Sequence, residues 1–126
     1  MQSSFDYAVI RVVPRVDREE FINAGVILFC KERRFLRARV ALLPERVRAL
    51  WPESDLNLID LHLAAFTRIC DGTPGAGPIA QLSQVERFHW LVSPRSTTVQ
   101  VSAVHSGLCE DPEMTLERLI QQLVVL

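Results

Sequence analysis

The chain has 126 residues, of which 48% are hydrophobic and 23% charged, with 14 basic and 15 acidic side chains. This length suits one domain with a real core, so we expect residues 1–126 to form a single domain, and the composition excludes extended disorder. A net charge of −1 argues against a general attraction to nucleic acid or to anionic lipid.

The first third of the chain predicts three strands of an antiparallel sheet. Residues 5–14 alternate imperfectly and end at a proline, as a half-covered strand does. Phe21 to Cys30, FINAGVILFC, ends in seven consecutive residues without a polar side chain, and charged segments lie on both sides. Such a run is typical of a strand that is buried on both faces. Because residues 35–42 alternate as well, we place FINAGVILFC in the middle of the three strands.

Helical segments are predicted between and after these strands. Residues 16–23 predict a helical turn, with Asp17 as its cap and Phe21 facing inward. Two helices follow the third strand, at residues 44–50 and 56–70, because Pro44 and Asp55 are typical of helix starts. The second of these helices has apolar residues at steps of three and four, which indicates one buried side.

The last part of the chain predicts two short strands and a final helix. The glycine- and proline-rich residues 71–78 predict a loop, and strands are expected at 90–92 and 97–104, joined by the turn 93–96. A C-terminal helix begins at Asp111-Pro112. The fold class that follows is α+β, a small antiparallel sheet with FINAGVILFC as a central strand, packed against two or three helices.

The most polar cluster of the sequence surrounds the turn 93–96. If the flanking strands are joined there, two arginines and one histidine come close together, and the residues after the proline offer donors suited to an oxyanion. The alternative is that the hydroxyl groups satisfy the backbone of the turn and that His105 bonds a carbonyl group. The candidate ligand- or partner-binding residues of this region are Arg87, His89, Arg95, Ser96, Thr97 and His105.

A second candidate lies at the entrance of the central strand, where Asn23 and Gly25 stand. A glycine in a strand indicates a bulge or a close approach, either by packed structure of the chain itself or by a ligand or partner. The arginines Arg11, Arg37 and Arg39 could share one face of the sheet. That face is then either solvated and internally paired, or a surface for phosphate or an acidic partner.

The sequence offers no strong catalytic arrangement. Ser96, His105 and Asp111 are present, but their spacing does not match a nucleophile elbow. His105 and Cys109 supply only two ligands for a metal ion. We therefore lean toward a protein without catalytic activity, cofactor or metal, and a hydrolase using His105 is the weaker alternative.

The expected location is the cytoplasm. No apolar run approaches the roughly 20 residues that a membrane-spanning helix requires, and the first residues lack the basic region of a secretory signal. The three cysteines, Cys30, Cys70 and Cys109, are odd in number and widely spaced, which is typical of free thiols in a reducing compartment.

Three segments together resemble a known family: YAVIRVVPRVDREEFINAGVILFC, RFHWLVSPRSTTVQ and VHSGLCEDPEMTLERL. The chain is similar, over essentially its whole length, to a bacterial domain-of-unknown-function family numbered 3037. The resemblance implies no activity. Members are often encoded beside a HipA-like protein kinase, which implies a shared pathway or a complex with such a kinase. Our leading hypothesis is an accessory or protein-interaction module. The alternative is a phosphate-, nucleotide- or nucleic-acid-binding module using Arg87, Arg95 and Ser96.

Overall fold

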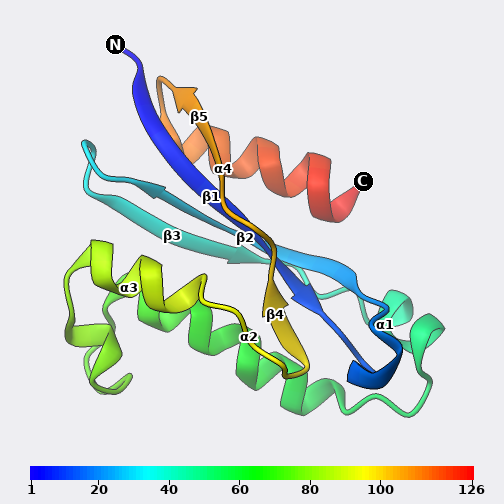
Figure 1. The fold of residues 1–126 in the computed structure, drawn as a ribbon. Coiled ribbons are helices and arrows are strands. Elements are labelled where there is room, and N and C mark those ends of the chain that lie inside the picture. Colours follow the sequence, from blue (N-terminus) through cyan, green and yellow to red (C-terminus); the bar gives the residue numbers. More distant parts are fainter.

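An open, five-stranded antiparallel sheet with helices packed against it makes up the computed structural model of the protein, which describes residues 1–126 (Figure 1). The fold class is α+β, as predicted. None of the helices is long and apolar enough to cross a membrane. The elements are β1 (Ser3–Val12), β2 (Ile22–Cys30), β3 (Phe35–Val40), α1 (Pro44–Leu50), α2 (Leu56–Asp71), α3 (Gln84–Leu91), β4 (Val99–Val101), β5 (His105–Cys109) and α4 (Pro112–Ile120).

The strand order is β3-β2-β1-β4, and β5 pairs with β1 on the same side as β4. FINAGVILFC therefore lies in the sheet as predicted, because β2 pairs with β1 on one side and with β3 on the other. The edge of β1 opposite β2 pairs with two short strands. The first half of β1 pairs with β5, and its last residues pair with β4. Ile10 pairs with Gly25 and Arg11 with Asn23, so Ala24 is the extra residue of a β-bulge.

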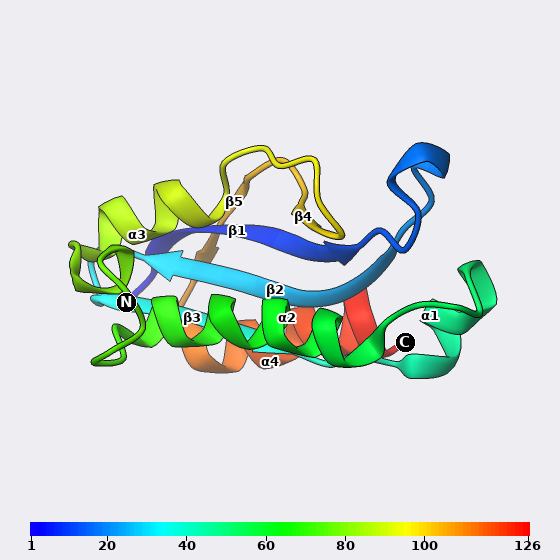
Figure 2. The ribbon, with the colours of Figure 1, turned by 90° about the horizontal axis from the view of Figure 1, so that it is seen from below.

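The two faces of the sheet carry separate apolar clusters. On the α2 face, Ile10, Ile27 and Ala38 of the strands pack with buried residues of α2 and α3. On the α4 face, Val26 and Leu28 pack with buried residues of α4. Figure 2 shows α2 running alongside β2 and β3, with α3 beside the first half of β1. This double burial explains why β2 reads as a continuous apolar run.

The predicted helix starts at Pro44, Asp55 and Asp111 are confirmed. The Asp55 carboxylate accepts a hydrogen bond from Leu58 N at 3.1 Å, and Asp111 accepts one from Glu113 N at 3.0 Å. These bonds satisfy N–H groups that have no partner within the helix.

The predicted strand at residues 90–92 is wrong, because Trp90 lies in the helix α3. Ser83 and Glu86 form a reciprocal capping box that starts this helix, and Phe88 and Leu91 are its buried residues. The loop 93–96 therefore joins a helix to a strand, and it is not a hairpin turn.

The predicted strand at residues 97–104 is only partly right, because β4 covers Val99–Val101 alone. The next residue, Ser102, ends it: the Ser102 hydroxyl accepts a hydrogen bond from Val9 N at 2.8 Å in the place of a main-chain carbonyl. Pairing resumes at β5, where no strand was predicted.

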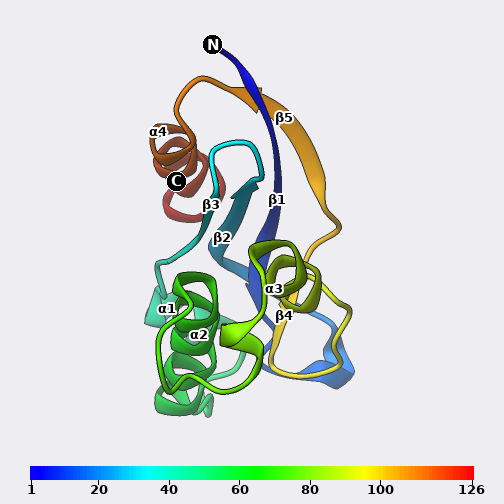
Figure 3. The same ribbon diagram turned by 90° about the vertical axis from the view of Figure 1, so that its left-hand side faces the viewer.

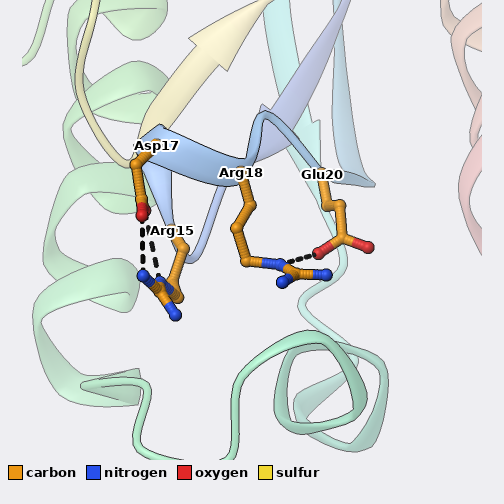
Figure 4. A network of polar contacts seen from close by, with 4 residues as sticks. All are labelled: Arg15, Asp17, Arg18 and Glu20. Carbon is orange, nitrogen blue, oxygen red and sulfur yellow. Dashed lines mark hydrogen bonds and ion pairs between the residues drawn. The ribbon is translucent and has the colours of Figure 1, made fainter.

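The connection between β1 and β2 is a short 3-10 turn whose charges pair with one another (Figure 4). Arg15 donates to Asp17 at 2.6 Å, and Arg18 donates to Glu20 at 2.5 Å. Asp17 therefore pairs with an arginine and does not cap the turn, and Phe21 is 45% exposed where an inward position was predicted. These bonds lower the pKa of the Asp17 and Glu20 carboxyl groups from their usual values.

Candidate functional site

Arg95 is held by the end of helix α3. Its guanidinium donates to Leu91 O at 2.7 Å and to Trp90 O at 2.9 Å, and it lies 5.1 Å from the Phe66 ring and 4.7 Å from the Trp90 ring. A positive charge is favourable at a helix C-terminus, where carbonyl groups lack partners. Partial burial lowers the pKa of Arg95 from its ordinary value. Two of its five donor positions are thus used within the fold.

Arg87 and His89 project from α3 toward different surroundings. The Arg87 Nη1 atom lies 3.5 Å from both Ile69 O and Ala80 O, near the end of α2. His89 is exposed and lines a hollow of about 370 Å³ with Asp6. Neither residue shares a hollow with Arg95, so the expected convergence of these side chains is not seen.

Asn23 and Gly25 are explained by packing within the chain. The Asn23 amide donates to Leu123 O at 2.9 Å, next to Val124 O and Val125 O, which accept from Arg46 at 2.7 and 3.0 Å. Both side chains thus bond carbonyl groups beyond the end of α4. A Cβ atom on Gly25 would lie 2.6 Å from Arg39 O, so the close approach comes from the backbone of β3.

His105, at the start of β5, is exposed and its ring centroid lies 5.3 Å from that of Tyr7. It makes no hydrogen bond to a serine, a cysteine or a carboxylate; the neighbouring Ser106 donates its hydroxyl to Asp6 at 2.6 Å. The cysteines are buried, and burial raises the pKa of the Cys70 thiol to about 12. No group of three or more His, Cys, Asp or Glu side chains is placed to hold a metal ion.

Ser96 and Thr97 lie in the exposed loop before β4. Thr97 donates its hydroxyl to Val99 O at 3.0 Å, which matches the interpretation that hydroxyl groups satisfy local backbone. Ser96 lines a polar cleft with Arg11 and Arg95. Of the predicted site, Arg95 therefore shares this cleft with Ser96 and shares a second, more apolar hollow with Thr97.

The outer edge of β5 carries unpaired main-chain groups, because β5 pairs with β1 and with no other strand. Ser102 N donates to Val9 O, and Val13 N donates to Thr98 O, so the odd-numbered residues of β1 bond toward this edge. In antiparallel pairs the bonded positions alternate. His105, Gly107 and Cys109 therefore bond to β1, which they face in the register.

The same alternation turns the N–H and C=O groups of Ser106 and Leu108 outward. Figure 3 shows β5 with no helix on its outer side. The strand contains no lysine, arginine, acidic residue or proline, which are the residues that usually protect a sheet edge. The Leu108 side chain is 64% exposed, and Met114 at the start of α4, beside the same end of the strand, is 71% exposed.

Sequence reasoning missed this edge because β5 does not look like a strand. Its sequence, HSGLC, has a glycine in the middle and no alternation. Packing favours the glycine, since a Cβ atom on Gly107 would lie 2.8 Å from the Phe5 ring. Only a contact between residues about a hundred positions apart reveals the strand.

A family model described as Protein of unknown function (DUF3037) matches residues 7–124 of the chain. The match confirms the resemblance stated from the sequence, and it includes the edge strand and every residue of the predicted site. No curated protein and no solved structure matches the chain.

Proposed function

We propose that this chain, a member of this family of proteins of unknown function, is a non-catalytic protein-interaction module. Since the family has no known activity, the support for this proposal comes from the surface of the protein. The observation that carries the proposal is the unprotected outer edge of β5. An extended segment of a partner protein adds to the sheet there as a further strand. Main-chain groups of Ser106 and Leu108 bind its backbone, and the exposed Leu108 and Met114 side chains contact its apolar residues.

The partner that we propose to test first is a HipA-like kinase, because the family resemblance points to it. Binding of a phosphate, nucleotide or nucleic acid through Arg87, Arg95 and Ser96 is less favoured, since the Arg95 guanidinium already donates to two carbonyl groups. A hydrolase built on His105 is also less favoured, since no nucleophile bonds to this histidine.

Co-expression with a HipA-like kinase encoded beside a family member, followed by size-exclusion chromatography with light scattering, tests the proposal. The wild-type protein is expected to elute with the kinase. Leu108→Lys places a charge on the edge, and Ser106→Pro removes an outward N–H group. Each change is expected to weaken the complex at least about tenfold, the loss of one or two interface contacts.

Leu61→Lys is the matched control, because Leu61 on α2 is 69% exposed, close to the 64% of Leu108. This variant is expected to bind as the wild type does. Equal binding by the Leu108→Lys and Leu61→Lys variants would show that the edge is not the interface. The absence of any complex with the wild type would exclude this partner.

Amide hydrogen exchange tests the geometry directly. In the isolated protein, Ser106 and Leu108 are expected to exchange quickly and Gly107 slowly, because only Gly107 donates toward β1. In the complex, the amides of Ser106 and Leu108 are expected to become protected. Unchanged exchange at both amides in a stable complex would contradict strand addition.

A further inference from the structure

Arg11 is a partly buried arginine without a partner. Its Nε atom is buried and forms no hydrogen bond, and no carboxylate lies within ion-pair distance of its guanidinium. Buried polar groups in folded proteins are nearly always bonded, so an exception requires an explanation. The desolvation of this charge is a cost that neither a hydrogen bond to Nε nor an ion pair offsets.

The other two arginines of the same face show how such a charge is normally matched. Arg37 pairs with Glu113 at 3.1 Å and Arg39 with Glu117 at 2.7 Å, both on α4. The prediction that these three arginines share one face is confirmed by the register, which continues that face from Arg37 and Arg39 through β2 to β1. Arg11 forms no ion pair with an acidic residue of α4, and it is the one arginine of the three without a counter-charge.

The guanidinium of Arg11 is held in a fixed orientation. Its central carbon lies 4.2 Å from the centroid of the Phe21 ring, which is itself 45% exposed. Stacking on an aromatic ring leaves the Nη N–H groups of Arg11, which unlike Nε are not buried, free to bind in the plane of the guanidinium. This contact also explains why Phe21 lies outside the core.

The space beside Arg11 is a polar cleft of about 260 Å³. Ser96, whose hydroxyl forms no hydrogen bond, and Gln100, the pairing partner of Arg11 on β4, lie in its wall. Arg95 adds a second positive charge to the lining, although two of its donor positions are used by α3. The residues come from β1, the β1–β2 connection, β4 and the loop before β4, so the cleft exists only in the folded chain.

The acidic residues of the β1–β2 connection do not neutralise Arg11. Asp17 and Glu20 are paired with Arg15 and Arg18 (Figure 4). Glu19 lines the cleft without forming an ion pair. A ligand can therefore supply the missing negative charge.

We propose that this cleft is a binding site for a small oxyanion, with Arg11 as the principal ligand and Ser96 as a hydroxyl donor. A phosphate or carboxylate group matches the planar arrangement of the Arg11 N–H groups. The volume is below the roughly 300 Å³ at which pockets for whole drug-sized ligands begin. The cleft therefore takes a single anionic group, and this inference does not depend on the proposed edge interface.

Titration with inorganic phosphate and with acetate, followed by the ¹⁵N signals of arginine Nε groups, tests the site. The Arg11 Nε–H signal is expected to shift and saturate with one anion or both, while the Arg37 signal stays unchanged at constant ionic strength. Phosphate alone would identify a phosphoryl group, and acetate would identify a carboxylate of a small molecule or an acidic side chain. No saturable shift with either anion would overturn the proposal.

Variants provide the second test. Arg11→Gln is expected to weaken binding at least about tenfold, because the charge-assisted bonds are lost. Arg37→Gln removes a charge from the same face and is expected to leave affinity unchanged. Glu19→Gln is expected to strengthen binding about twofold to threefold, because it removes a negative charge from the cleft. If Arg11→Gln does not fold, the Arg11 Nε–H signals of the wild type and of the Glu19→Gln variant still test the site. Equal affinity of the Arg11→Gln and Arg37→Gln variants would refute it.

Discussion

Strand β3 closes one edge of the sheet with charge, whereas β5 leaves the opposite edge without any. Arg37 and Arg39 on β3 pair with carboxylates of α4, and both α2 and α4 pack against this strand. β5 carries no such charge, and no helix covers its outer side (Figure 3). Sheets that avoid association protect their edges by charge or by covering them. Of the two edges, the β5 edge is the one that neither charge nor a helix protects.

The largest difference in stability between the closed and the open side is expected when their glycines are replaced. These are Gly25 of β2, which pairs with β3, and Gly107 of β5. A Cβ atom on Gly25 would lie 2.6 Å from Arg39 O, a backbone atom that cannot move without separating β3 from β2. Gly25→Ala is therefore expected to lower the free energy of unfolding by about 3 kcal/mol, as overpacking in a core does. Urea denaturation followed by circular dichroism measures this change.

Gly107→Ala serves as the comparison on the open side. The nearest atom to its added Cβ is the tip of the Phe5 ring, at 2.8 Å, and a ring can turn aside. We expect a loss of about 1 kcal/mol, the lower end of overpacking costs. If the two substitutions cost the same, the open edge is as rigid as the closed one.

The second prediction concerns the hydroxyl group that divides the open edge into β4 and β5. The Ser102 side chain is buried, and it accepts from Val9 N at 2.8 Å. Ser102→Ala leaves this N–H group without a partner, so we expect a loss of about 2 kcal/mol in the free energy of unfolding. Faster amide exchange at Val9 is the local measurement.

Ser93→Ala is the control for that change, because Ser93 is exposed and its hydroxyl donates to His89 O at 2.8 Å. Little change in stability is expected, since water replaces that bond. Equal stability of the Ser102→Ala variant and the wild type would mean that a main-chain carbonyl between β4 and β5 replaces the Ser102 hydroxyl as the acceptor for Val9 N.

The contrast between the edges also explains which features could be predicted from the sequence. The helix starts at Asp55 and Asp111 depend on residues nearby in the sequence, so they were predicted correctly. The burial of β2 was also predicted correctly, because its residues are almost all apolar. β5 depends on Phe5, and α3 depends on the capping box that Ser83 starts. β5 was not predicted, and residues 90–92, where α3 ends, were predicted as a strand, because apolar alternation reveals neither element.

Arginine roles were the other failure of sequence reasoning. Arg95 and Arg46 bond carbonyl groups at or beyond helix ends, and no pattern in the sequence identifies those acceptors. The sequence grouped Arg11 with Arg37 and Arg39 correctly. It could not reveal that α4 neutralises two of the three, because that depends on where the helix crosses the sheet.

The smallest effect is expected from the ion pairs of β3. The Arg39 and Glu117 side chains are 51% and 46% exposed, so their pair is screened by solvent. Glu117→Gln is expected to lower the free energy of unfolding by less than about 1 kcal/mol, with no change in association state.

Arg39→Val separates the two roles of this charge. Its effect on stability is expected to be equally small, because it removes the same pair, but it also leaves an uncharged side chain on the β3 edge. Concentration-dependent association, measured by sedimentation velocity, is therefore expected for Arg39→Val and not for Glu117→Gln. A monomeric Arg39→Val variant at every concentration would show that packing by α2 and α4, rather than charge, closes this edge. The availability of β5 would then follow from the lack of a helix beyond it.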